Sequence, residues 1–232
     1  MVVRELTGGI YFGQPSEIDE EGMNSVDTCL YSKDEILRAA RIAFDLAGNS
    51  RNKLTLVDKA NVLATSRLWR KTVQELAPEY PEVEVEYLFV DNAAMQLIIR
   101  PNQFDVILTE NMFGDILSDQ GGGILGSLGL MPSACLGDEK AYYEPSHGSA
   151  PDIAGKNIAN PYSMIGSVAM MLENSFAMEE EAKNVWAAMQ GVFADGYSTA
   201  DLSKSGSGVK MIGTAEFGDK VVEKLRAMPA VG

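Results

Sequence analysis

The sequence contains little of several residue types and patterns that mark common protein classes. It has one histidine and two cysteines in 232 residues, and Cys29 and Cys135 fit no metal-binding or disulfide spacing. We therefore expect a chain of the reducing cytosol. The apolar stretch at residues 121–136 is too short and too rich in glycine to span a membrane. No signal-peptide pattern follows Met1, so the sequence predicts a cytoplasmic protein without a membrane partner.

Positive charge is also scarce. The 19 lysines and arginines stand against 33 acidic residues, which gives a formal net charge of -14. This excess of acid argues against nucleic acid as a partner, because a phosphate-backbone binder needs a basic surface. No G-x-G-x-x-G lies between a predicted strand and a helix, which argues against the usual dinucleotide-binding fold. Hydrophobic residues make up 46% of the chain, enough for a sizeable core in one large domain or two small ones.

The most informative stretch, residues 104–123, reads FDVILTENMFGDILSDQGGG. Its apolar run Val106–Leu108 predicts a short buried strand. If the next segment is helical, Asp115 and Asp119 lie on one face, one turn apart. Two like charges there cost stability unless a cation lies between them, and Mg²⁺ or Mn²⁺ suits carboxylate oxygens. The alternative is a solvated acidic start of a helix, and the spacing favours metal only slightly.

The rest of the pattern alternates strands with helices and predicts a wound α/β sheet. A capping box at Ser32–Glu35 predicts the start of the first helix, which ends at Gly48. A loop rich in Gly, Pro, Ser and Asn is expected over residues 142–160. Strands are expected at residues 2–6, 53–57, 83–90 and 104–109. Two further extended runs, at 10–12 and 26–31, are candidates to pair with each other. Further helices are expected at 66–76, 92–99, 161–178, 179–194 and 214–228.

Four candidate side chains follow predicted strands, where ligands bind in α/β sheets. They are Lys59, Asp91, Asp115 and Asp119, and we expect them to converge on one face. The three carboxylates are either the ligands of one metal or unrelated surface acids. Lys59 is either a general base, whose proton affinity a nearby metal would lower, or half of an ion pair with Asp58 or another neighbour. The pattern gives these two interpretations of Lys59 equal weight.

Two single residues and one loop are further candidates, each with a structural alternative. Tyr11 suits a proton donor, although a buried structural tyrosine is commoner. Arg4 suits a bidentate clamp for a substrate carboxylate, or an ordinary ion pair. The loop His147–Asp152 combines small residues, a histidine able to stack, and an acid able to bind ribose hydroxyls and repel a 2′-phosphate. Its alternative is a plain connecting loop.

Six motifs, in this order, make the chain resemble the isocitrate/isopropylmalate dehydrogenase family of β-decarboxylating dehydrogenases: VVRELTGGIYFG, LVDKANVLATSRLW, VDNAAMQL, ENMFGDILSD, GSLGLMPSA and HGSAPDIAGKNIANP. The resemblance implies a two-domain, non-Rossmann α/β fold and a homodimer with shared active sites. It implies oxidation of (2R,3S)-3-isopropylmalate by NAD and metal-assisted decarboxylation to 2-oxoisocaproate, in leucine biosynthesis. A tartrate or homoisocitrate dehydrogenase, or a dimerising fragment without activity, is the alternative.

The resemblance also implies roles for single residues. Arg4 would bind the malate carboxylate, Tyr11 would protonate the enolate, and Lys59 would take the hydroxyl proton. Asp91, Asp115 and Asp119 would hold Mg²⁺ or Mn²⁺, with Lys59 and Asp91 reaching the substrate and metal in the partner's site. The adenosine of NAD would lie against a loop, with its ribose on Asp152: His147, Gly148, Ser149, Ala150, Pro151, Asp152, Ile153 and Asn160.

One departure from the family is large. Its members carry a substantial segment before the VVRELTGG strand, which this sequence does not contain. The resemblance therefore predicts a central dimer-forming domain at residues 1–125, with the substrate and metal residues, and the C-terminal half of a larger cofactor-binding domain at residues 126–232. We expect the 232-residue chain by itself to have little dehydrogenase activity. A smaller departure, Gly121–Gly123, is expected to loosen the helix after the metal aspartates.

Overall fold

The structure is a computed structural model that describes residues 1–202 and 208–229. The chain divides into two compact units, Met1–Gly121 and Gly122–Gly232. Within the described residues, no helix combines the length and apolar character needed to cross a membrane.

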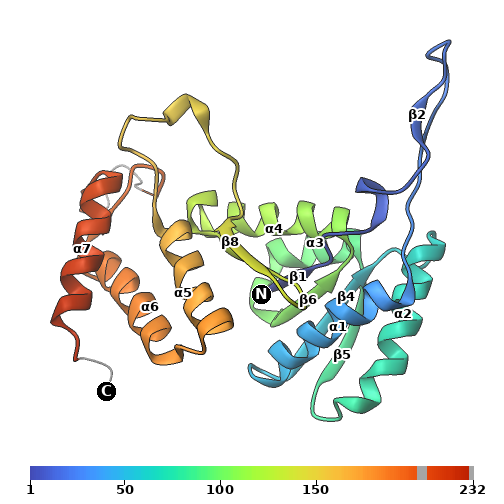
Figure 1. Ribbon diagram of the computed structural model, residues 1–232, viewed down its shortest axis with the longest axis horizontal. Helices are drawn as coiled ribbons and strands as arrows, with labels where there is room; N and C mark the ends of the chain where they lie inside the picture. Colours follow the sequence, from blue (N-terminus) through green and yellow to red (C-terminus); the bar gives the residue numbers. More distant parts are fainter. Residues whose placement is uncertain (203–207, 230–232) are drawn as a thin grey trace. The chain divides into compact units, whose positions relative to one another are not determined.

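The first unit is built around a parallel four-stranded sheet with the order β1-β6-β4-β5 (Figure 1). Its two central strands, β4 and β6, are buried along almost their whole length, as expected of parallel strands covered on both faces. All four strands were predicted from the sequence. Their bounds are β1 (Val2–Arg4), β4 (Lys53–Asp58), β5 (Glu84–Phe89) and β6 (Val106–Thr109).

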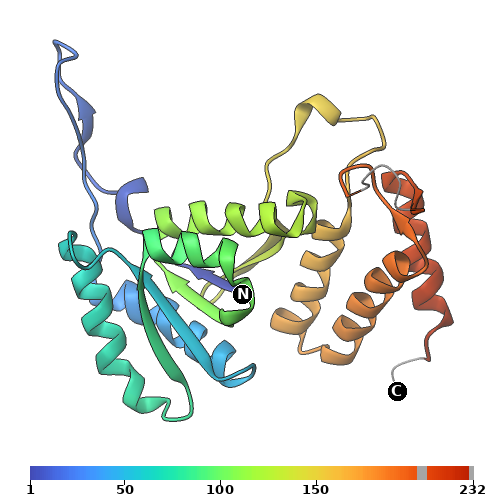
Figure 2. The same ribbon diagram turned by 180° about the vertical axis from the view of Figure 1, so that it is seen from behind.

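Two helices cover each face of this sheet (Figures 1 and 2). Leu54 and Leu56 of β4 pack with α1 and α2, while Val57 packs with α3 and α4, because successive side chains of a strand point to opposite faces. The predicted wound α/β sheet is confirmed. The helices are α1 (Lys33–Gly48), α2 (Ala64–Leu76), α3 (Val90–Ile99) and α4 (Asn111–Leu125), with short 3₁₀ turns η2 (Ala77–Glu79) and η3 (Pro101–Gln103).

The capping box that predicts the start of α1 is confirmed. The Glu35 N–H donates to Ser32 Oγ at 3.3 Å, and the Ser32 N–H donates to Glu35 Oε2 at 2.7 Å. Each side chain thus satisfies a backbone N–H that has no partner within the helix.

Two local expectations are wrong. Residues 10–12, expected to be extended, belong to the 3₁₀ turn η1 (Gly9–Tyr11) and the residue after it, because Gly9 takes a φ of +76° and the N–H groups of Phe12 and Gly13 donate back to its carbonyl oxygen. The loop expected from residue 142 begins with a strand, β8 (Ala141–Pro145), paired antiparallel with β7 (Pro132–Leu136). Helix α4 runs through its three glycines to Leu125.

A hairpin arm projects from the rest of the first unit (Figure 1). It consists of β2 (Ser16–Ile18) and β3 (Ser25–Asp27), which pair antiparallel and are exposed at every residue. The sequence predicts an arm here and a returning extended run. The partner of that run is Ser16–Ile18, however, and not residues 10–12.

The second unit contains the three helices that the sequence predicts. A core between α6 and α7 includes the buried side chains of Met189 and Phe217, and α5 adds Tyr162, whose ring centroid lies 5.6 Å from that of Phe193. Besides β7 and β8, its elements are η4 (Leu128–Leu130), η5 (Pro151–Ile153), α5 (Tyr162–Phe176), α6 (Glu179–Ala194), β9 (Tyr197–Ser198), β10 (Lys210–Met211) and α7 (Thr214–Ala227).

Candidate functional site

Arg4, the last residue of β1, reaches the first turns of α4. Its Nη1 donates to Asp115 Oδ1 at 2.5 Å, and its Nε and Nη2 donate to Asn111 Oδ1 at 2.9 and 2.8 Å. These contacts join residues more than a hundred positions apart, because β1 lies beside β6 and β6 leads directly into α4. The Arg4 side chain is 24% exposed and that of Asp115 50% exposed, so solutes can reach the pair.

Gly114 makes this close approach possible. A Cβ at position 114 would lie 2.7 Å from Arg4 Cγ and 2.8 Å from Arg4 Cβ, which is closer than carbon atoms pack. The glycine of the ENMFGDILSD motif, Gly114, therefore lets the aliphatic part of Arg4 lie across helix α4.

Tyr11 joins the same cluster. Its hydroxyl donates to Asp115 Oδ2 at 2.8 Å, and the Arg4 guanidinium lies 5.6 Å from the centre of its ring. The hydrogen bond to Asp115 raises the pKa of Tyr11 above its ordinary value, so the phenol holds its proton at neutral pH. Tyr11 is 51% exposed, which does not fit a buried structural tyrosine. The geometry suits a proton donor.

Lys59 and Asp91 form a second group at the ends of the neighbouring strands β4 and β5. Lys59 Nζ donates to Asp91 Oδ1 at 2.5 Å, and this hydrogen bond lowers the pKa of the Asp91 carboxyl. The other candidate partner, Asp58, is buried and occupied by Arg70, whose Nε and Nη2 reach its two oxygens at 2.8 and 2.9 Å. Lys59 is therefore in an ion pair within this chain, but with Asp91.

The three candidate metal carboxylates do not gather in one chain. Among the residues that the structure describes, no three His, Cys, Asp or Glu side chains lie close enough to hold a metal ion. Asp115 belongs to the cluster with Arg4 and Tyr11, and Asp119 lies exposed one turn further along α4. Asp91 belongs to the group with Lys59. Asp91, Asp115 and Asp119 therefore form no three-carboxylate metal site within the described part of a single chain.

The loop predicted to bind adenosine lies in the second unit and is anchored by its histidine. His147 Nε2 lies 2.9 Å from Ser163 Oγ in the first turn of α5. Ala150 has a φ of +44° and precedes η5, which carries Asp152 in its first turn. The backbone and side chains of most of this loop are open to solvent: Gly148, Ser149, Ala150, Pro151 and Asp152 are exposed, and His147 and Ile153 half-buried.

Asn160 differs from the other candidates of this loop because its side chain is buried and already bonded. Its Oδ1 accepts from the Tyr162 N–H at 3.0 Å, and its Nδ2 donates to Asp201 Oδ2 at 3.2 Å. The amide holds the start of α5 in place, and both polar atoms of the Asn160 side chain are engaged in doing so.

The motif pattern does not single out Asn111 or Glu5, although both lie at the Arg4 cluster. Both are buried polar residues, with 2% and 3% of their surface exposed. The one local signal is Glu5 itself, a charged residue directly after an apolar strand. Asn111 carries no such signal, because an asparagine near a helix start is ordinary.

The isocitrate/isopropylmalate dehydrogenase sequence family matches residues 1–221, and the chain belongs to this family. It is 55% identical over 225 residues to the 3-isopropylmalate dehydrogenase of Thermotoga maritima, and 53% identical over 230 residues to that of Halalkalibacterium halodurans. These alignments cover 97% and 98% of this chain but 62% and 63% of the relatives. The chain thus spans less than two thirds of the length of the curated relatives it matches.

Solved structures agree with the family. A crystal structure of isocitrate dehydrogenase from Methylococcus capsulatus superimposes with a TM-score of 0.89 at 41% identity, over 97% of this chain and 66% of that one. The TT0538 protein from Thermus thermophilus gives 0.87 at 35% identity, over 98% of this chain and 46% of that one. The expected fold, the non-Rossmann α/β fold of this family, is confirmed.

Proposed function

We propose that this chain carries the substrate, metal and adenosine residues of an NAD-dependent, cytoplasmic 3-isopropylmalate dehydrogenase. The reaction is oxidation and decarboxylation of (2R,3S)-3-isopropylmalate to 2-oxoisocaproate, in leucine biosynthesis. The observation that carries the proposal is Asp115, whose two oxygens accept hydrogen bonds from Arg4 and from Tyr11. A carboxylate binder, a proton donor and a candidate metal ligand thus meet at one point. The names of the relatives support isopropylmalate as the substrate.

Each of the chain's own residues has a defined task in this reaction. Arg4 binds a carboxylate of the substrate through its guanidinium N–H groups. Lys59 would accept the proton of the substrate hydroxyl. NAD, when bound, would supply the hydride acceptor for the carbon that carries this hydroxyl. After the carbon–carbon bond to the leaving carboxylate breaks and CO₂ departs, Tyr11 donates its proton to the carbon of the enolate. The raised pKa of Tyr11 keeps that proton in place until it is needed.

A divalent cation fits the donor set of α4. Asp115 and Asp119 offer hard carboxylate oxygens one helical turn apart, and both side chains can be reached from solvent. Mg²⁺ or Mn²⁺ held there would stabilise the negative charge that develops on the substrate's oxygens. Asp91 would be the third ligand. Since it lies outside any three-residue group in one chain, it would come from the partner subunit.

The separation of the two groups supports a homodimer with shared active sites. One chain supplies Arg4, Tyr11 and Asp115, and the partner would supply Lys59 and Asp91. The first unit also has surfaces suited to a second copy of the chain, because apolar side chains of α3 and α4 are largely exposed. These are Met95 at 50%, Ile98 at 69%, Ile99 at 61% and Ile116 at 56%.

Metal binding tests the proposed function directly. Asp115→Asn and Asp119→Asn should each weaken Mn²⁺ binding, measured by calorimetry in the presence of isopropylmalate, by at least about tenfold, since each removes a charged ligand. Asp138→Asn, which changes an exposed acid in the second unit, is the matched control and should bind Mn²⁺ like the unaltered protein. Equal Mn²⁺ affinity in all four proteins would contradict the metal site.

The cofactor preference is a separate prediction. Asp152 should accept hydrogen bonds from the ribose hydroxyls of NAD and repel the 2′-phosphate of NADP. We expect kcat/KM to be higher with NAD than with NADP. Asp152→Asn should lower the ratio of kcat/KM for NAD to kcat/KM for NADP by about tenfold or more, because the hydrogen bond from the ribose to a charged group is lost and the repulsion of the 2′-phosphate disappears. Steady-state kinetics with both cofactors measures this. An unaltered protein that prefers NADP would refute the role of Asp152.

A further inference from the structure

We propose that Asn111 is a positioning residue, which fixes the guanidinium of Arg4 for the substrate carboxylate without cancelling its charge. The inference rests on the proposed function, because it assigns a device that serves the substrate-binding role of Arg4. It is carried by the contacts of Asn111 itself.

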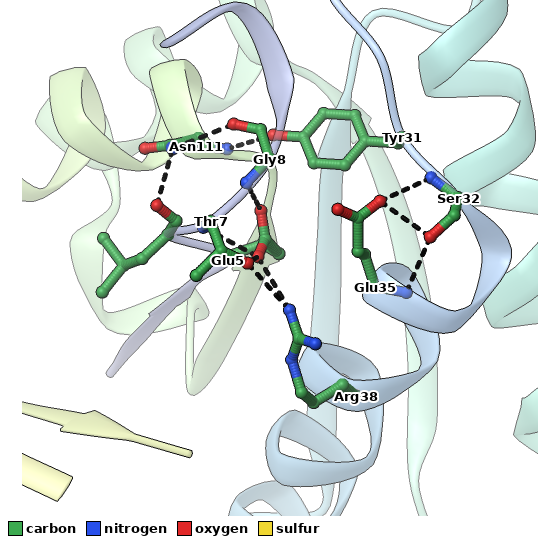
Figure 3. Close-up of polar contacts among 9 residues, drawn as sticks. Glu5, Thr7, Gly8, Tyr31, Ser32, Glu35, Arg38 and Asn111 are labelled. Carbon is green, nitrogen blue, oxygen red and sulfur yellow. Dashed lines mark hydrogen bonds and ion pairs between the residues drawn. The ribbon is translucent and has the colours of Figure 1, made fainter. Parts of the chain in front are cut away.

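The polar atoms of the Asn111 side chain are all in use. Oδ1 accepts from Arg4 Nε and Nη2 at 2.9 and 2.8 Å. Nδ2 donates to the carbonyl oxygens of Leu6 and Gly8, each at 3.1 Å, and Figure 3 draws this side of Asn111. Its backbone N–H donates to the Tyr31 hydroxyl at 3.0 Å. The opposite orientation of the amide would set its N–H₂ against the donors of Arg4, so these partners select one orientation.

This contact decides which side of Arg4 faces the substrate. A guanidinium has five N–H donors in a planar fork. Asn111 occupies the edge formed by Nε and Nη2, which leaves Nη1, now on Asp115, and the second N–H of Nη2 for an incoming carboxylate. An aspartate at position 111 would hold the same edge, but it would pair with the positive charge that attracts the substrate. A neutral amide positions the fork and adds no negative charge to that of Asp115, which already contacts Nη1.

The turn that accepts hydrogen bonds from the Asn111 amide is itself held in place by Glu5. Glu5, directly after β1, accepts from the N–H groups of Thr7 and Gly8 at 2.9 and 2.8 Å, and from Arg38 Nη2 at 3.2 Å (Figure 3). It thereby fixes the turn whose carbonyl groups receive the Asn111 amide.

Tyr31 holds the other side of Asn111 and depends on a glycine. A Cβ at Gly9 would lie 2.3 Å from the Tyr31 hydroxyl oxygen, so the ring can lie there only because position 9 has no side chain. Asn111 is thus held by three parts of the chain: the carbonyl groups of the turn after β1, the hydroxyl of Tyr31 shortly before α1, and its own helix α4. A side chain that only filled space would not need three such anchors.

A double-mutant cycle tests this role in a protein that joins this chain to the N-terminal segment of its relatives. All kinetic measurements proposed for this chain use the same joined protein. Asn111→Ala should raise the KM for isopropylmalate by about ten- to one-hundredfold, the range for a hydrogen bond to a charged group, and change kcat and the KM for NAD much less. In an Arg4→Ala background the same substitution should add almost nothing, because its effect passes through Arg4. Val73→Ala, in the core on the α1–α2 face, is the control: it lowers stability and should leave the KM for isopropylmalate unchanged.

The outcomes separate this inference from the proposed function. If Arg4→Ala leaves the KM unchanged, both fail. If Arg4→Ala raises the KM but Asn111→Ala does not, or if the two effects multiply, only the inference about Asn111 is overturned. If the alanine variant does not fold, Asn111→Asp replaces it, since it keeps an acceptor for Arg4 and should still raise the KM by cancelling its charge; an unchanged KM there overturns the inference.

A spectroscopic readout needs no turnover. In ¹⁵N-arginine spectra of the chain, the Arg4 Nε–H resonance should be protected from exchange with water, and Asn111→Ala should remove that protection. Equal exchange in both proteins would show that Asn111 does not hold Arg4.

Discussion

Lys59→Ala is expected to lower kcat by about one-hundredfold to ten-thousandfold, the usual contribution of a general base. Asp115→Asn should also be inactive, because it replaces one of the two oxygens that accept from Arg4 and Tyr11 by an N–H₂ group and removes the charge of a proposed metal ligand. Mixing the two inactive proteins should restore activity. Each mixed dimer would contain one site with both Lys59 and Asp115 intact, so recovery should reach up to about a quarter of the unaltered activity in a symmetric dimer.

The controls for this experiment come from the same chain. Lys33→Ala removes an exposed lysine paired with Glu75, far in sequence from the candidate site, and should leave kcat unchanged. Subunit exchange is followed by native mass spectrometry with a tag on one partner. Full exchange without any recovery would mean that Lys59 and Asp115 of the same chain work together, and the shared site would be wrong.

Glu110→Gln is expected to remove a strong pH dependence of stability. Glu110 is 3% exposed and its carboxylate lies 3.8 Å from Cys29 Sγ, and burial raises its pKa to about 7. In the unfolded chain its pKa is about 4.3. Between these values the folded protein holds a proton that the unfolded chain has lost, so stability is full below pH 4.3 and falls as pH rises to 7. The loss is about 4 kcal/mol.

The glutamine variant carries no charge at this position, so that loss should not occur. Urea unfolding at pH 5 and pH 8 should show a variant more stable than the unaltered chain at pH 8, by about 4 kcal/mol, and by less at pH 5. Glu5→Gln is the contrasting variant: its carboxylate accepts from Arg38 and two backbone N–H groups, so it should lose stability at pH 8. The same pH dependence with and without Glu110 would sink the idea.

Local sequence patterns were sufficient to predict most of the helices and strands. The apolar runs at β4 and β6, the capping box at Ser32 and the helical spacing over α1 each depend on neighbours within a few positions, and all appear as expected. The sequence by itself also determined the family, because its motifs are long and in a fixed order. It also indicated which residues are candidates to carry the chemistry.

Only the tertiary structure decided how those residues group. Arg4 meets Asp115 because β1 pairs with β6, and Lys59 meets Asp91 because β4 pairs with β5. The order β1-β6-β4-β5 therefore places Arg4 and Asp115 at the ends of one pair of neighbouring strands, and Lys59 and Asp91 at the ends of the other. Partners distant in sequence likewise decide three other features. These are the proposed role of Asn111, the turn at Gly9 against the Tyr31 ring, and the pairing of β8 with β7. No periodicity encodes such contacts, since they arise from strand order and packing, which residue spacing does not specify.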